Sequence, residues 1–171
     1  QSKEQPKPSS PRTKKKTISK RGYFGIGIEN PKTDTNVGTL WRSAYIMGAA
    51  FVFTIGKEYK HQGSDTAKSW RHLPLYFYPD FDTFHTSLPY DCHLVGVELH
   101  TKSVPLPSFD HPERCVYLLG AEARGISKKA LKQCEHIIEL PSNKKISLNV
   151  ATAGSIVMYD REAKSNKKAS A

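Results

Sequence analysis

The sequence predicts an α/β fold with a mainly parallel sheet flanked by helices. Apolar runs such as FVFTI at 51–55 and CVYLLG at 115–120 lack polar alternation, which is typical of strands buried on both faces. Segments with helical spacing, such as VGTLWRSAYIMGA at 37–49, separate these runs. Strands of this kind that alternate with helices indicate a parallel sheet covered on both sides.

Strands and helices are predicted to alternate from the start of the folded region. The first strand, GYFGIGI at 22–28, ends at an Asn-Pro turn signal, and the helix at 37–49 follows it. After the strand at 51–55, a polar loop covers 56–72. The remaining strands are predicted at 73–78, 93–99, 115–120 and 136–140.

Three further helices complete the predicted fold. Residues 80–88 open on acidic side chains, which favour a helix N-terminus, and Ser127 can cap a helix at 126–134. The last helix begins at about Leu148. Because 171 residues with 37% hydrophobic side chains suffice for one core, we expect a single domain at 22–162.

Most of the net charge of +10 lies outside this domain. Residues 1–21 contain eight Lys and Arg against one Glu and are rich in Pro and Ser, so we expect a disordered basic tail. Such arms commonly contact phosphate backbones, and the alternative is a solubilising leader. Residues 163–171 are expected to form a second, shorter tail.

Composition also excludes several classes of protein. No apolar run approaches the roughly 18–20 residues of a membrane helix, and no secretory signal is visible. Cys92, Cys115 and Cys134 are far apart and form no CxxC, which indicates reduced thiols rather than disulfides or a zinc site. The histidines lack metal-ligand spacing. We therefore expect a cytoplasmic protein without a metal.

Polar stretches that follow strands are candidate sites, because open parallel sheets bind ligands beyond the carboxyl ends of their strands. In the first stretch, at 30–42, Asn36, Gly38 and Arg42 form N-x-G-x-x-x-R across a helix start. Asn36 suits the cap of that helix, and Gly38 permits close backbone approach. Arg42 has apolar neighbours, so we expect it to be partly buried against an anionic or carbonyl partner. The alternative to a catalytic role for Arg42 is a structural ion pair with a carboxylate.

Two more polar stretches follow later strands. LLGAEARG at 118–125 contains G-x-E-x-x-G, in which Gly120 admits a ligand, Glu122 presents a carboxylate and Gly125 makes the next turn. The third stretch, at 140–149, has Leu-Pro before a loop and Ser-Leu-Asn at a helix start. Each stretch alone is a weak signal.

Together the three stretches resemble the motifs of the SPOUT RNA methyltransferases, in the TrmH/SpoU-like branch that methylates ribose 2′-hydroxyls. That family shows N-x-G-x-x-x-R, then G-x-E-x-x-G, then [I/L]-P followed by S-L-N, and all three occur here in this order. The resemblance covers residues 22 to about 162. It implies a deep trefoil knot at the C-terminal end of the sheet, S-adenosylmethionine bound in the knot, and a homodimer with each active site near the interface.

The resemblance also implies roles for individual residues. Those implied to hold the cofactor are Leu99, Gly120, Leu140 and Leu148. Those implied to form the catalytic site are Arg42, Asn36, Glu122, Ser147 and Asn149. Arg42 could accept the hydroxyl proton or stabilise developing charge. Because a guanidinium group normally stays charged, we prefer stabilisation, with Glu122 or a water as the proton acceptor.

Two departures from the family pattern affect the prediction. Where relatives carry a glycine-containing turn, this chain has SNKK at 142–145, so the shape of the cofactor loop is open. Asn143 could adopt the left-handed conformation there, and Lys144 and Lys145 could contact RNA. We also expect no separate RNA-binding domain, and we favour tRNA over ribosomal RNA because single-domain relatives act largely on tRNA.

A basic loop and two alternative functions complete the prediction. The loop at 59–72 interleaves Lys, Arg and His with Trp70, which suits an unpaired nucleotide, although Trp70 could equally anchor the loop to the core. The alternative functions are a non-catalytic RNA-binding protein on the same fold and a methyltransferase acting on a base nitrogen. The intact motif residues speak against the first, and the Ser-Leu-Asn motif with Arg42 speaks against the second.

Overall fold

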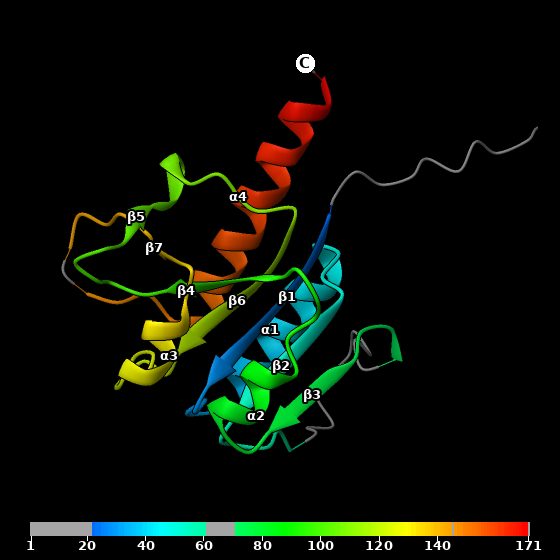
Figure 1. Ribbon diagram of the computed structural model, residues 1–171, viewed down its shortest axis with the longest axis vertical. Coiled ribbons are helices and arrows are strands. Elements are labelled where there is room, and N and C mark those ends of the chain that lie inside the picture. Colours follow the sequence, from blue (N-terminus) through cyan, green and yellow to red (C-terminus); the bar gives the residue numbers. More distant parts are fainter. Residues whose placement is uncertain (1–21, 61–70, 145, 171) are drawn as a thin grey trace, which may run out of the picture.

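The computed structural model describes residues 22–60, 71–144 and 146–170, and within these ranges seven parallel strands form one sheet (Figure 1). The strands are β1 (Tyr23–Glu29), β2 (Phe51–Ile55), β3 (Leu75–Tyr78), β4 (His93–Val97), β5 (Val104–Pro105), β6 (Arg114–Gly120) and β7 (His136–Glu139). Neighbouring strands lie in the order β3-β2-β1-β6-β4-β7-β5. The predicted α/β fold with a mainly parallel sheet is therefore confirmed.

Helices cover both faces of this sheet (Figure 1). They are α1 (Asp34–Ile46), α2 (Phe81–Thr86), α3 (Lys128–Gln133), α4 (Val150–Ser170) and the short 3-10 helix η2 (Leu106–Ser108). On one face α1 and α4 pack together, and side chains such as Leu40 and Met158 enter the core. On the other face α2 and α3 contribute Phe84 and Ala130. Both faces are thus largely covered, which leaves the ends of the strands as the place for a site.

The central strands β1, β2, β4 and β6 are buried on both faces, as their continuous apolar runs predicted, whereas β3 and β5 are partly or fully exposed. In β6, Val116 and Leu118 belong to the cluster beneath α2 and α3, whereas Tyr117 and Leu119 belong to the cluster beneath α1 and α4. Each of these four residues is at most 1% exposed. Successive side chains of a strand point to opposite faces, so a strand covered on both sides needs apolar residues at every position.

A glycine lets α4 lie close against α1. A Cβ at Gly154 would lie 2.5 Å from Leu40 Cδ1, so a larger residue would require this buried side chain to move. The hydroxyls of Ser155 and Ser43 are hydrogen-bonded at 2.8 Å across the same contact. The packing brings the first turns of the two helices together, in the region where the polar motifs lie.

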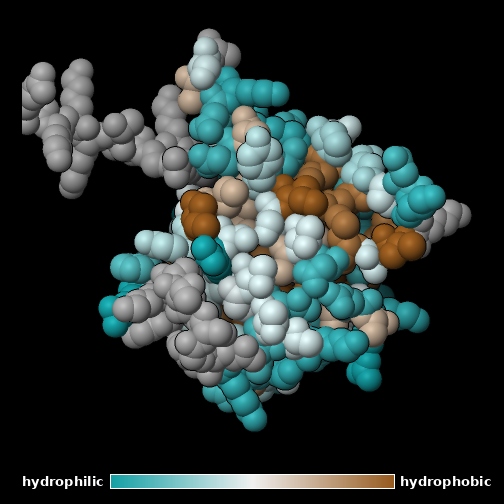
Figure 2. Space-filling model, turned by 180° about the vertical axis from the view of Figure 1, so that it is seen from behind, coloured by the Kyte–Doolittle hydropathy of each residue, from teal (hydrophilic) through white to brown (hydrophobic). Residues whose placement is uncertain are grey.

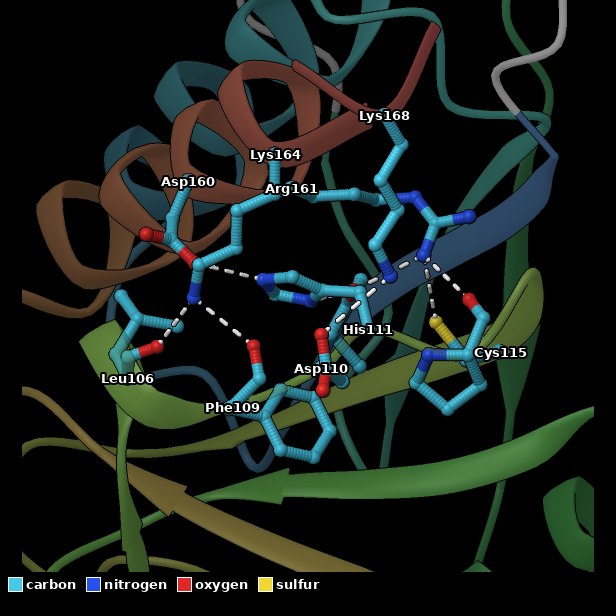
Figure 3. A network of polar contacts seen from close by, with 11 residues as sticks. Leu106, Phe109, Asp110, His111, Cys115, Asp160, Arg161, Lys164 and Lys168 are labelled. Atoms are coloured by element: carbon cyan, nitrogen blue, oxygen red, sulfur yellow. Dashed lines mark hydrogen bonds and ion pairs between the residues drawn. The ribbon is translucent and has the colours of Figure 1, made fainter. Parts of the chain in front are cut away.

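The second half of α4 is held by side chains that reach the segment 106–115 (Figure 3). Lys164 donates to two main-chain carbonyls of this segment, at 2.7 and 2.9 Å. Arg161, only 4% exposed, donates to the carbonyls of Pro112 and Glu113 at 2.7 and 2.8 Å. Residues 163–170, which we predicted to be a tail, therefore continue α4 instead.

Other predicted boundaries differ by a few residues. The first helix begins at Asp34 rather than 37 and ends at Ile46, where Gly48 with a φ of +79° turns the chain away. The last helix begins at Val150, two residues after the predicted start. The elements β5 and η2, at 104–108, were not predicted, because a two-residue strand containing a proline leaves little signal.

Some expectations concern residues outside this description. The predicted basic tail at 1–21 and residues 61–70 of the basic loop, including Trp70, lie there. Among the described helices, none is both long and apolar enough to cross a bilayer. Cys92, Cys115 and Cys134 are free thiols.

Candidate active site

A pocket lies at the carboxyl ends of β4, β6 and β7, where an open parallel sheet is expected to bind its ligand. The turn after β6 and the segment before α4 complete its walls. The predicted site residues found in this lining are Leu99, Gly120, Glu122, Leu140, Ser147 and Leu148. All the predicted cofactor-binding residues therefore line one pocket.

Three polar side chains meet beside this pocket, one from each sequence motif. Asn149 Nδ2 donates hydrogen bonds to Glu122 Oε1 at 2.8 Å and to Asn36 Oδ1 at 2.9 Å. Asn36 Nδ2 also donates to Glu122 Oε1, at 3.4 Å. Asn36 and Glu122, which are 113 and 27 residues away from Asn149 in sequence, thus meet it in a single hydrogen-bonded cluster. We call Asn36, Glu122 and Asn149 the polar triad.

Asn149 is fixed in place because it also begins α4. Its Oδ1 accepts from the main-chain N–H groups of Ala151 and Thr152 at 3.0 and 3.2 Å, which is the geometry of a helix cap. The amide of one side chain therefore caps the helix with its oxygen and binds the triad with its nitrogen. Asn149 is thus both the cap of α4 and a member of the polar triad beside the pocket.

The predicted cap of α1 is wrong. Thr33 occupies the N-cap position, and its hydroxyl accepts from the main-chain N–H of Asn36 at 3.3 Å. Asn36 lies within the first turn of the helix, so its own side chain is available to Glu122 and Asn149. The sequence TDTN offers several good capping residues in a row, and only the tertiary contacts of Asn36 decide among them.

Two carboxylates brace the turn that carries Glu122. Glu98 Oε2 accepts from the main-chain N–H of Ile126 at 3.0 Å. Glu29, 4% exposed, accepts from the main-chain N–H and the hydroxyl of Ser127 at 2.7 and 2.8 Å. We did not single out Glu29, although an acidic residue that ends a buried apolar strand is a usable signal, since such a charge requires donors.

The glycines of the second motif allow this turn to close tightly. A Cβ at Gly120 would lie 2.1 Å from the carbonyl carbon of Gly125. Gly125 has a φ of +65°, and a Cβ there would lie 2.4 Å from Glu98 Oε2. Neither position can accept a side chain without moving the wall of the pocket, as the G-x-E-x-x-G pattern suggested.

Large apolar side chains are exposed around the pocket. Leu99 is 60% exposed, Leu148 is 44% exposed and Ile146 is 74% exposed. Three carboxylates, those of Glu98, Glu122 and Glu139, share the same lining. An apolar wall combined with acidic side chains suits a ligand that has a flat apolar part and a cationic part.

Two predicted catalytic residues are not drawn into the triad. Arg42 is exposed and lies outside the pocket lining, so its predicted partial burial is wrong. The buried face of α1 consists of Val37, Leu40, Trp41 and Ala44, and Arg42 points away from this stripe. Ser147 lines the pocket and is exposed, and no hydrogen bond joins its side chain to the residues that the structure describes.

The loop before α4 also differs from its prediction. Asn143 does not have a positive φ; the described non-glycine residues that do are Asn30 and Asp91. The loop is instead closed by Ser142, whose hydroxyl donates to the carbonyl of Lys144. Lys144 is exposed, and Lys145 lies outside the description. Within the described ranges, no group of three or more His, Cys, Asp or Glu side chains is placed to hold a metal ion.

Residues 24–159 match the SpoU rRNA Methylase family, and the chain belongs to this family. An archaeal relative, an uncharacterized tRNA/rRNA methyltransferase of Archaeoglobus fulgidus, is 27% identical over 151 residues. A mouse relative, the tRNA (guanosine(18)-2′-O)-methyltransferase TARBP1, is 28% identical over 156 residues. The matches cover 81% and 85% of this chain, but only 63% of the archaeal relative and 9% of the mouse relative.

The fold also matches a solved structure, that of the SpoU methyltransferase AviRb from Streptomyces viridochromogenes in complex with the cofactor AdoMet. The TM-score is 0.73 at 22% identity, over 84% of this chain and 58% of that chain. At this identity the likeness establishes a shared fold.

Proposed function

We propose that the protein is an S-adenosylmethionine-dependent RNA methyltransferase that acts on a ribose 2′-hydroxyl. The observation that carries the proposal is the polar triad of Asn36, Glu122 and Asn149 beside a pocket at the strand ends. Membership of the SpoU rRNA Methylase family supports methyl transfer to RNA. The name of the mouse relative, a 2′-O-methyltransferase of tRNA, supports the ribose as the acceptor.

The pocket residues fit S-adenosylmethionine. The exposed side chains of Leu99 and Leu148 supply apolar surface for an adenine ring, and the main chain near Gly120 and Leu140 supplies donors and acceptors. The acidic lining suits a sulfonium cation. When bound, this cofactor supplies an electrophilic methyl group.

Glu122 is our candidate for the acceptor of the hydroxyl proton. Its Oε1 receives the amide hydrogens of both asparagines, and its Oε2 has no hydrogen bond from the residues that the structure describes. The carboxylate is therefore held in one orientation by Oε1 while Oε2 is available to a substrate hydroxyl. A positioned carboxylate of this kind can act as a general base.

Arg42 is proposed to act on the RNA rather than on the cofactor. Its side chain is exposed, lies outside the cofactor pocket and forms no hydrogen bond or ion pair with the described part of the chain. A guanidinium group normally stays charged and binds phosphate oxygens through two parallel hydrogen bonds. Arg42 would hold the phosphate next to the target ribose and stabilise the developing alkoxide.

The proposal includes a homodimer and a deep trefoil knot formed by the segment between β7 and α4. Two large side chains of α4 support the dimer, because Ile156 is 39% exposed and Tyr159 is 64% exposed, whereas Val157 and Met158 of the same helix are buried. Apolar side chains gather on one face of the molecule between polar surroundings (Figure 2). Such a face is typical of protein–protein contacts.

The proposed substrate is tRNA rather than ribosomal RNA, in the cytoplasm. The net charge of +10 favours a polyanionic partner of either kind. The name of the mouse relative, which specifies a tRNA guanosine, supports tRNA.

The test is methylation of bulk RNA by the purified protein. Undermodified tRNA and, separately, undermodified ribosomal RNA would be incubated with S-adenosylmethionine, digested to nucleosides and examined by mass spectrometry. We expect a new 2′-O-methylnucleoside from tRNA. A methylated base would contradict the ribose assignment. No product from either RNA, together with no cofactor binding by calorimetry, would favour a non-catalytic RNA-binding protein.

A further inference from the structure

A second concave surface borders the same β4–β5 connection as the cofactor pocket. This connection, α3 and the start of β7 line a groove that takes in His100, Lys102, Lys128, Lys132 and His136. Leu99 lines the pocket, and the next residues of the same connection line the groove. The pocket and the groove are therefore neighbours along this connection. We call this surface the basic groove.

The basic groove has a net positive charge. Lys102, Lys128 and Lys132 are exposed, and no ion pair joins them to any residue that the structure describes. Among its described residues the groove contains one carboxylate, that of Glu135, which is hydrogen-bonded to His93 Nδ1 at 2.6 Å. The groove thus contains three lysines against one carboxylate, whereas the described lining of the neighbouring pocket contains three carboxylates and no lysine or arginine.

Helix stability accounts for Lys132, which lies in the last turn of α3, but not for Lys128. Lys128 begins α3, and positive charge in the first turn of a helix is unfavourable. The next residue, Lys129, is not part of the groove and is paired with Asp82 of α2. One lysine of the first turn therefore has a structural partner, while its neighbour faces the groove without one.

The remaining surface of the groove suits the bases of unpaired nucleotides. Val104, Leu131 and Ile137 supply aliphatic surface. The imidazole rings of His100 and His136 border it, and His136 packs edge-on against Phe109 at 5.6 Å between ring centroids. Bases of single-stranded RNA stack on aromatic and imidazole rings, while lysines contact the phosphates.

We propose that the basic groove binds an unpaired segment of the substrate RNA next to the target nucleotide. This inference rests on the proposed function, because it assigns the groove to the RNA whose ribose reaches the pocket. Lys102, Lys128 and Lys132 contact successive phosphates, and the rings of His100 and His136 receive bases. The groove sets the direction in which the RNA leaves the active site.

The test compares two triple variants of the full chain. Lys102→Ala/Lys128→Ala/Lys132→Ala removes the groove charges, and Lys129→Ala/Lys167→Ala/Lys168→Ala removes the same charge elsewhere. Binding of a fluorescein-labelled single-stranded RNA is followed by anisotropy between 50 and 300 mM KCl. Each phosphate contact contributes about 0.7 to the slope of log K against log salt for single strands, so the groove variant should lose about 2 from this slope.

We expect the groove variant to bind RNA roughly tenfold or more weakly at low salt, with the control variant within about threefold of wild type. A third variant with arginine at the three groove positions should retain the wild-type slope. Equal losses in the groove and control variants would overturn the proposal. The proposal would also be overturned if the groove variant bound RNA as tightly as wild type but no longer bound an oligoglutamate peptide.

Parallel measurements separate this proposal from the proposed function. Thermal unfolding and calorimetric binding of S-adenosylmethionine should be unchanged in the groove variant. If RNA binding depends on the groove lysines but wild type methylates no RNA, the groove assignment holds and the enzymatic proposal fails. If wild type methylates RNA but the loss of these lysines does not change RNA binding, only the groove assignment is wrong.

Discussion

The side-chain amide of Asn149 donates to the carboxylate of Glu122 at 2.8 Å, and the same side chain caps α4 through its oxygen. The start of the last helix and the turn after β6 are therefore fixed relative to each other by one residue. Asn36 joins the same carboxylate from α1. A change at any member of the triad should affect the geometry of the site more than the fold.

Asn149 allows the cap and the site to be separated. Asn149→Ala removes both roles and should lower the free energy of unfolding by about 1 kcal/mol, together with methyl transfer. Asn149→Ser retains a capping oxygen but lacks the amide hydrogens that bind Glu122 and Asn36. It should unfold like wild type in urea and yet transfer methyl groups slowly. Full activity of the serine variant would mean that the amide contacts do not position the site.

Glu122 should be essential to the chemical step. Glu122→Gln keeps the shape and one acceptor oxygen but cannot accept a proton as a carboxylate does. We expect kcat to fall by roughly 100-fold or more, as for the loss of a general base. The dissociation constant of S-adenosylmethionine, measured by calorimetry, should change only a fewfold. If kcat stays within tenfold of wild type, another group accepts the proton.

Arg42 should contribute to RNA methylation and not to stability. Because its side chain is exposed and unpaired with described residues, Arg42→Ala should change the free energy of unfolding by less than about 0.5 kcal/mol. Transfer to RNA should nearly cease, while cofactor affinity stays within a fewfold. Arg42→Lys, which keeps the charge but not the bidentate geometry, should recover part of the activity. Loss of cofactor binding in the alanine variant would make Arg42 structural.

His111 should make stability depend on pH below about 6.5. Its ring is bonded to Tyr117 and to Asp160, and its burial lowers its pKa from the ordinary 6.5 (Figure 3). As the pH falls below 6.5, the unfolded chain therefore binds a proton at His111 before the folded chain does. The contribution of His111 to the free energy of unfolding is complete above pH 6.5 and is lost as the pH falls through the lowered pKa.

Urea unfolding at several pH values checks this dependence on His111. His111→Gln, which does not titrate, should be less stable at pH 7.5 but should lose less stability than wild type between pH 7 and pH 5. Parallel curves for the two proteins would show that the imidazole is not the titrating group. The positive charges of Lys164 and Arg161 in α4 also lower the pKa of His111. Both residues are present in wild type and in the His111→Gln variant.

Much of the fold follows from local pattern. The strand at 51–55 coincides with β2, because every one of its residues is apolar or β-branched and is buried. Ser127 caps α3 as predicted, with its hydroxyl accepting from Ala130 at 3.2 Å. Such elements are decided by neighbouring residues, so the sequence is sufficient to identify them.

The rest depended on contacts between distant segments. The continuation of α4 through 163–170 rests on Lys164 and Arg161 reaching carbonyls some 50 residues earlier, which no local pattern reveals. The motifs predicted which residues share a pocket, but not that Asn149 is the centre of the triad. Nor could they place Arg42 outside it, because the apolar neighbours of Arg42 in sequence lie on the opposite side of the helix.

The most direct measurement of the central claim is the position of the transferred methyl group. S-adenosylmethionine with a deuterated methyl group would be used with undermodified tRNA, and the labelled nucleoside would be fragmented by tandem mass spectrometry. We predict that the label stays on the sugar, so that the released base has its natural mass, and that Glu122→Gln yields almost none of this product. A label on the released base would contradict the account, because the triad would then serve a base nitrogen rather than a ribose hydroxyl.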